Sequence, residues 1–301
     1  MIWFFITILI YFIFALAAIL DKYILRENAL KPKSYAFYDS IGGILFIFLI
    51  FLPQFKIGPN LILIALLVGI LKVSAIFVFY TAINNFEPSR VLPAIGGFLP
   101  CFTFFFSLAL AQNHLENLNF VRIISLFLLI SGSFLINFER KKINLNALGL
   151  SFFSAFLFSL YFVFAKFLYL NAKFFNSLLW ILFFSGLFSL IFLFSKEVRL
   201  ELKKERKILN KETAFTFILD KSLSMIGGFL QHLAISLVPI SLLAFINALE
   251  GIKYVFILIL SLFFSKNFPT IFLEKKGKSI LCFKILSIFL IFASMFIFYY
   301  L

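Results

Sequence analysis

Long apolar stretches dominate this chain and constrain its fold more than any other feature. A run of about 20 mostly apolar residues forms a helix that crosses a hydrocarbon core of ~30 Å. Ten such runs follow one another, and the connections between them are mostly short. The predicted spans are residues 2–20, 34–52, 61–83, 91–111, 120–138, 147–170, 177–195, 213–237, 241–265 and 279–300. We therefore predict an all-α integral membrane protein with ten transmembrane helices. The longest connection, 196–212, is too charged to enter lipid.

The composition excludes a soluble globular protein. Of the 301 residues, 63% are apolar and 13% are charged, which leaves too few polar side chains for a water-facing surface. The net charge of +14 indicates topology rather than a nucleic-acid partner, because basic residues gather in the cytoplasmic loops of membrane proteins. The connections after the odd-numbered spans hold 19 Lys and Arg residues, whereas the other connections hold Lys56 and Lys173, and Arg122 lies at the start of the fifth span. The odd-numbered connections are predicted to be cytoplasmic, with both termini on the other side of the cell (inner or plasma) membrane.

The chain is poor in residues that bind metals or act as nucleophiles. Its Cys and His residues are Cys101, Cys282, His114 and His232, and they form no pattern with metal-ligand spacing. The usual motifs of hydrolases, zinc peptidases, nucleotide-binding loops and dinucleotide-binding folds are also missing. We expect no metal, no cofactor and no enzymatic activity.

An internal duplication relates the two halves of the chain. When the sixth span is placed on the first at an offset of 144, small and polar residues recur on one helical face, and Tyr11 belongs to the first stripe. Both stripes end in a lysine, Lys22 and Lys166. Small residues also allow helices to pack closely, but packing alone does not explain the repeated lysine.

A second set of residues recurs in the same order in both halves. We therefore predict two homologous five-helix units, 1–143 and 144–301, and because five is odd the second must be inverted relative to the first. The paired segments are Lys72-Val73-Ser74 with Lys221-Ser222-Leu223, Pro88 with Pro239, Glu116 with Glu274, and Ser125 and Gly132 with Ser287 and Ser294.

The order of these motifs resembles the EamA pattern of the drug/metabolite transporter superfamily. The residues that carry the resemblance are Pro88-Ser89-Arg90-Val91, Pro100, Glu116, Ser125 and Gly132, together with 247–254. The resemblance implies two five-helix repeats around a central cavity, a lysine at the end of the first helix of each repeat, and export of small metabolites such as amino acids. Asp39 departs from it, because members often carry arginine there. Members are also usually drawn with cytoplasmic termini, opposite to the loop count.

Charged residues inside the spans are the candidates for function, since each costs ~2.5–3.5 kcal/mol in the bilayer and normally has a partner or a water-filled cavity. Glu250 and Lys253 are three residues apart on one helix, with Asn247 one turn earlier. They form either a self-neutralised pair or a proton-coupling site on Glu250. Lys22 and Lys166 are near span ends and either enter the cavity or reach the headgroups. The remaining charges are Asp39, Lys72, Asp220 and Lys221.

Two further spans contain polar or helix-breaking residues. The eighth span has a stripe that includes Asp220 and Gln231, and we expect Gln231 to contact substrate, whereas the adjacent His232 is more typical of hydrogen-bonded structure. In the fourth span, proline and glycine predict either a helix break that frees a carbonyl for the site or an ordinary packing kink. Arg90 at its start would hold an anionic group or a lipid phosphate. The four helix-breaking residues are Pro93, Gly96, Gly97 and Pro100.

These observations together predict a secondary transporter with alternating access between its two halves. In this hypothesis, protons on Glu250 exchange for a small solute held by Lys72, Arg90, Gln231 and Asn247. A lipid-linked sugar or phospholipid flippase is an alternative within transport. A non-transporting membrane scaffold and an intramembrane enzyme are alternatives of another class, and a homodimer is left open.

Overall fold

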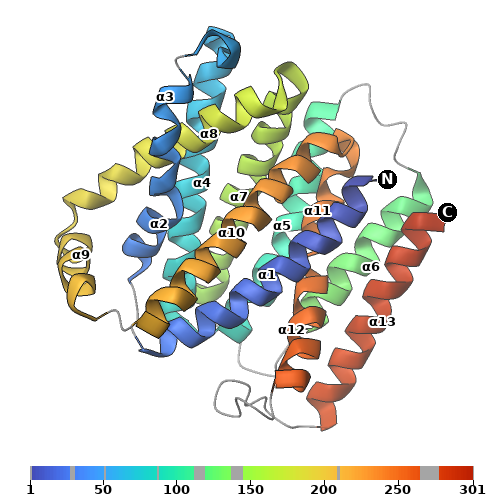
Figure 1. Ribbon diagram of the computed structural model, residues 1–301. Coiled ribbons are helices and arrows are strands. Elements are labelled where there is room, and N and C mark those ends of the chain that lie inside the picture. Colours follow the sequence, from blue (N-terminus) through green and yellow to red (C-terminus); the bar gives the residue numbers. More distant parts are fainter. Residues whose placement is uncertain are drawn as a thin grey trace.

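The computed structural model describes residues 2–27, 31–50, 52–86, 88–111, 119–136, 145–208, 211–264 and 278–300. Within these ranges the chain forms helices and no strand, and each predicted apolar segment is largely helical. The α-helices are α1 (Ile2–Glu27), α2 (Pro32–Ile41), α3 (Ile47–Ile50), α4 (Pro59–Asn85), α5 (Pro88–Ala111), α6 (Phe120–Ile136), α7 (Leu145–Asn171), α8 (Phe174–Ser189), α9 (Lys196–Ile208), α10 (Lys211–Leu237), α11 (Leu243–Ala248), α12 (Gly251–Phe264) and α13 (Lys278–Tyr300) (Figure 1). Short 3₁₀ helices are η1 (Gly42–Phe46), η2 (Pro53–Phe55), η3 (Leu190–Phe194) and η4 (Ile240–Leu242).

Six helical segments in the described part are long and apolar enough to cross a membrane. The architecture is therefore all-α, with the helices of a multi-pass membrane protein. Shorter apolar helical stretches lie in α5, α6 and α13. The six segments are Ile2–Leu20, Pro32–Ile50, Pro59–Asn85, Leu145–Asn171, Phe174–Phe194 and Ile240–Ile257.

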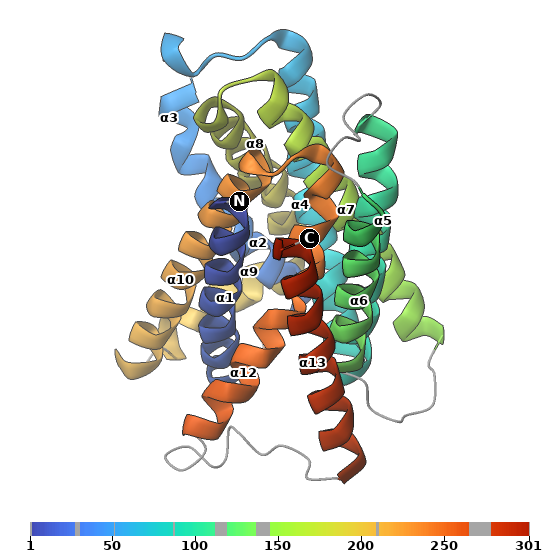
Figure 2. The ribbon, with the colours of Figure 1, turned by 90° about the vertical axis from the view of Figure 1, so that its right-hand side faces the viewer.

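The helices pack in pairs that join the two halves of the sequence. Helix α1 lies beside α10, α4 and α5 pack on α7, and α6 packs on α13 (Figure 2). Helix α8 lies along α4 and crosses α2 and η1. Both ends of the chain lie at the same end of the bundle (Figures 1 and 2). The buried apolar side chains between these pairs include Ile10, Leu168, Ile235 and Phe245.

Glycines allow α8 to approach its neighbours at backbone distance. A Cβ atom added at Gly43 would lie 1.8 Å from the carbonyl oxygen of Leu182, and one at Gly186 would lie 2.6 Å from the amide nitrogen of Ile44. A Cβ atom at Gly69 on α4 would meet α8 at 2.8 Å. Small residues at helix interfaces permit this close packing in membranes. The segments α2–η1, α4 and α8 thus form one tightly packed group.

The charged connection predicted at 196–212 is itself helical over Lys196–Ile208. Helix α9 lies at the periphery of the bundle (Figure 1) and is held to the start of α2. The Nζ atoms of Lys31 and Lys33 lie 3.5 and 3.7 Å from the Glu197 carboxylate, and Val198 is fully buried. The connection is therefore a docked surface helix.

Candidate functional site

A histidine held between two tyrosines lies at the centre of the candidate site. On α10, His232 Nε2 lies 3.0 Å from the Tyr161 hydroxyl, and Nδ1 lies 2.6 Å from the Tyr169 hydroxyl. The two tyrosines are eight residues apart on α7, a spacing of about two helical turns that puts them on one face. A neutral imidazole donates at one nitrogen and accepts at the other, so both ring nitrogens are satisfied. The sequence-based preference for a hydrogen-bonded His232 agrees with this geometry.

Two opposite charges lie near different members of this hydrogen-bonded group and have no ion-pair partner among the described side chains. The carboxylate of Asp39 on α2 interacts electrostatically with Tyr161, and Lys72 on α4 interacts electrostatically with His232. Asp39 is exposed and Lys72 is partly buried. Neither forms an ion pair or a hydrogen bond with any side chain that the structure describes. We name Asp39, Lys72, Tyr161, Tyr169 and His232 the central polar cluster.

The ammonium group of Lys166 is hydrogen-bonded to the backbone of a neighbouring helix. Its ammonium group donates a hydrogen bond of 2.9 Å to the carbonyl oxygen of Ser236, and the side chain is 2% exposed. Ser236 lies in the last turn of α10, where the final carbonyls have no partner within the helix and the helix dipole favours a positive charge. Lys166 therefore caps the C-terminus of α10 from α7.

The other predicted charges form neighbouring pairs. Lys253 Nζ lies 2.5 Å from Glu250 Oε1 and 5.0 Å from the centre of the Tyr254 ring. Lys221 Nζ lies 2.9 Å from a carboxylate oxygen of Asp220, which is fully buried. Each pair neutralises itself locally, which is the alternative considered for Glu250 and Lys253 from sequence.

The helix of the ninth apolar segment is interrupted between α11 and α12. At this interruption, α11 forms hydrogen bonds with α1 and α5. Helix α11 ends at Ala248 and α12 begins at Gly251. Because the amide of Glu250 donates to Asn247 one residue short of the α-helical pattern, the carbonyl of Ile246 loses its usual donor. The Tyr11 hydroxyl donates to that carbonyl at 2.8 Å. The interruption is thus stabilised from α1.

Asn247 faces α5 from the other side of the same interruption. Its side-chain amide donates a hydrogen bond of 2.8 Å to the Thr103 hydroxyl, which in turn donates to the carbonyl of Leu99 at 2.8 Å. Asn247 is 2% exposed and Thr103 is fully buried. The predicted substrate residue Asn247 therefore makes an interhelical contact in this structure.

Two interpretations of the fourth span were left open from sequence, a helix break that frees a carbonyl and an ordinary packing kink. Helix α5 is continuous from Pro88 to Ala111 through Gly96, Gly97 and Pro100, and the interruption lies in the ninth segment instead. Helices in membranes tolerate proline because neighbouring groups satisfy the freed backbone. The side chains of Lys22, Arg90 and Pro93 lie outside the part of the chain that the structure describes.

The site residues predicted from sequence therefore lie in separate groups. Asp39 lies near Tyr161 and Lys72 near His232 in the central polar cluster, and Gln231, which precedes His232 on α10, is partly buried. Tyr11, Asn247, Glu250 and Lys253 gather around the α11–α12 interruption. Sequence reasoning missed Tyr161 and Tyr169, although their spacing of eight was a usable signal. Within the described ranges, no three His, Cys, Asp or Glu residues are grouped to hold a metal ion.

Comparison with known proteins identifies the fold and no family. No protein-family model matches the chain, and no curated protein matches it significantly. One solved structure, described only as "Crystal structure of protein", is similar with a TM-score of 0.65 and 14% sequence identity. The similarity covers 99% of this chain and 97% of that one. The chain therefore shares the whole fold of a known structure.

Proposed function

We propose that this chain is an EamA-like secondary transporter with ten spans in two inverted halves, which exports a small metabolite across the cell membrane. The observation that carries the proposal is the pair of opposite charges at the central polar cluster. A charge inside the bilayer costs ~2.5–3.5 kcal/mol unless it is paired or hydrated. Asp39 and Lys72 lie on predicted spans without a described partner, so a water-filled cavity between α2, α4, α7 and α10 accounts for them.

The contrast with the other charges favours transport over a scaffold. A scaffold requires a dry, self-neutralised interior, and the Glu250–Lys253 and Asp220–Lys221 pairs fit that description. The central polar cluster does not. Its exposed carboxylate and its ammonium match the ammonium and carboxylate of a zwitterion such as a free amino acid, and Tyr161 and Tyr169 add hydroxyl groups to the same region.

Contacts between equivalent positions support the inverted halves. When two related halves pack across a twofold axis, a contact between residue i of one half and residue j of the other is accompanied by the contact between residue j of the first half and residue i of the second. Gly43 in the second span lies against the backbone of α8, where a Cβ atom on it would be 3.4 Å from the Gly186 amide nitrogen. The two glycines are 143 residues apart, which is also the offset between the starts of the second and seventh spans, 34 and 177. Helix α1 packs on α10 as α4 packs on α7, which is the pairing that the repeat predicts.

The contact between α6 and α13 has the same reciprocal form. The Ser125 hydroxyl donates to the Ser294 carbonyl at 3.1 Å, and the Ser294 hydroxyl donates to the Ser125 carbonyl at 2.5 Å. A Cβ atom at Gly132 would lie 3.1 Å from the Ser287 carbonyl oxygen. Since Ser125 corresponds to Ser287 and Gly132 to Ser294, both contacts belong to one twofold relation.

Cysteine labelling tests whether the cluster is hydrated. In a chain with Cys101 and Cys282 replaced by serine, Lys72→Cys should react with a membrane-impermeant thiol reagent from one side of the membrane. Val73→Cys is the matched control, because Val73 is fully buried and should stay unlabelled. A Lys72→Cys variant that is unreactive from both sides would show a dry interior and support the scaffold alternative.

Transport itself is tested in proteoliposomes loaded with unlabelled amino acids. The wild-type chain should exchange radiolabelled amino acids of at least one type across the vesicle membrane. Asp39→Asn and Lys72→Met should each abolish the exchange, whereas Lys173→Gln, at an exposed surface position, should leave it intact. If the labelled cavity exists but no amino acid exchanges, the zwitterion assignment is wrong while the cavity stands.

A further inference from the structure

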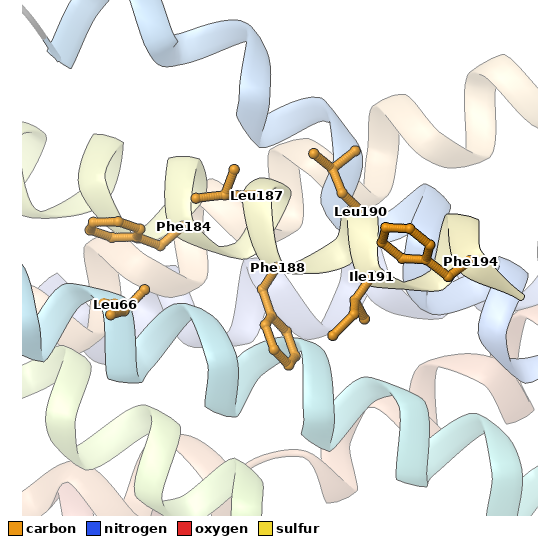
Figure 3. A pocket seen from close by; sticks show the side chains of 7 residues that line it. All are labelled: Leu66, Phe184, Leu187, Phe188, Leu190, Ile191 and Phe194. Carbon is orange, nitrogen blue, oxygen red and sulfur yellow. The ribbon is translucent and has the colours of Figure 1, made fainter.

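An apolar groove runs along the outer surface of the bundle between α4 and α8. Leu66 of α4 and six apolar residues between Phe184 and Phe194 line it, with a cavity volume of about 310 Å³ (Figure 3). Phe188 and Ile191 point toward α4. Ile191 is 53% and Phe194 85% exposed. The groove has the size of a small ligand pocket and lacks the polar groups that usually orient a soluble ligand.

The end of this groove meets a basic surface helix. Phe194 is the last groove residue, and α9 begins two residues later at Lys196. Lys196 and Arg199 are exposed, and neither has an acidic partner in the described part of the chain. The nearby Glu197 is neutralised by Lys31 and Lys33. The charge at the mouth of the groove is therefore positive.

The loop charges place this end on the cytoplasmic side, where anionic lipids give the membrane a negative surface. A lipid acyl chain matches the wholly apolar groove, and an anionic headgroup matches the basic residues at its end. A protein partner matches less well, because a groove within the hydrocarbon region is surrounded by lipid. We propose that the groove and the start of α9 form one binding site for an anionic phospholipid, with an acyl chain between α4 and α8 and the phosphate beside Lys196 and Arg199.

Tryptophan quenching reports occupancy directly. The chain has two Trp residues, and the Trp180 ring lies 5.5 Å from the ring of the groove residue Phe184. In full-length protein carrying Trp3→Phe, phosphatidylglycerol brominated along its acyl chains should quench Trp180 at a lower mole fraction than brominated phosphatidylcholine. Each basic residue near an anionic surface contributes a preference of about fivefold. Lys196→Gln with Arg199→Gln should therefore remove most of the preference, whereas Lys173→Gln should keep it.

A groove-filling variant tests the other half of the site. Ile191→Phe should weaken quenching by both lipids, whereas Leu63→Phe, on the exposed surface of α4 outside the groove, should not. Equal quenching of the wild-type chain by the two lipids would overturn the proposal. So would an unchanged preference in the Lys196 and Arg199 double variant, or equal effects of Ile191→Phe and Leu63→Phe. The site does not depend on transport, so these outcomes are separate from those of the proteoliposome assay.

Discussion

The close packing of η1 on α8 predicts a large difference between two adjacent glycines. Alanine at position 43 would place its Cβ atom 1.8 Å from the carbonyl oxygen of Leu182, which is backbone and has no rotamer to change. Ordinary contact begins at 3.4 Å, so the two segments must separate by about 1.6 Å locally. Overpacking of this kind costs ~1–3 kcal/mol. The matched control is Gly42→Ala, because a Cβ atom there meets nothing within 4 Å.

The assay is thermal unfolding of the purified protein in detergent. Gly42 has helical backbone angles of −55° and −24°, so alanine there should be neutral or stabilise the fold by ~0.4–1 kcal/mol. At ~2–4 °C for each kcal/mol, Gly43→Ala should lower the unfolding midpoint by several degrees relative to wild type. Equal midpoints for Gly43→Ala and Gly42→Ala would refute the packing of η1 on α8 described above.

Three further changes test the polar contacts. Lys253→Met should destabilise the chain by roughly 3 kcal/mol, the lower end of the range for a buried pair, because it leaves Glu250, which is 19% exposed, without its partner, and adding Glu250→Gln should recover most of the lost thermal midpoint. Tyr11→Phe should cost ~1 kcal/mol and speed amide hydrogen exchange around 246–252, because the Ile246 carbonyl loses its donor. Lys166→Met should cost ~1–2 kcal/mol and fray the end of α10, seen as faster exchange at 234–238. Unchanged exchange in either of the last two variants would contradict the assigned hydrogen bond.

The helical segments could be predicted from sequence because one physical rule determines them. In lipid every backbone polar group needs an internal partner, so a long apolar run has few options other than a helix. The charged connection was harder to predict, because its helix depends on docking against α2 through Glu197 and Val198. That contact joins residues about 165 positions apart, and no local pattern encodes it.

The interruption of the ninth segment was not predicted from sequence, for a related reason. Pro93 and Pro100 suggested a break in the fourth span, yet α5 is continuous. The interruption lies between Ala248 and Gly251, where Gly251 is the local signal that the sequence offers. What stabilises it is the Tyr11 hydroxyl from a helix 235 residues away in sequence. A hydrogen bond from so distant a residue leaves no local pattern in the sequence.

The candidate site was predictable residue by residue but not as a cluster. Asp39, Lys72 and His232 stood out because polar groups are costly in spans. Tyr161 and Tyr169 did not, since tyrosine is common among aromatic-rich helices and only the fold brings both hydroxyls to His232. Because burying a polar group in a span is costly, polar residues in spans are candidates for a functional site. Tertiary packing determines which of these residues contact one another.

The interface between α7 and α10 is formed mainly by hydrogen bonds rather than by closely packed side chains. The two backbones approach closely over a short stretch only, yet Tyr161, Tyr169 and Lys166 all reach across to α10. The stability of such an interface depends on whether other hydrogen-bond donors and acceptors, such as water or a solute, are present nearby. A solute or water that bonds to Tyr161 or Tyr169 competes directly with His232. Binding of such a solute or water and separation of these two helices are therefore linked by the same few hydrogen bonds.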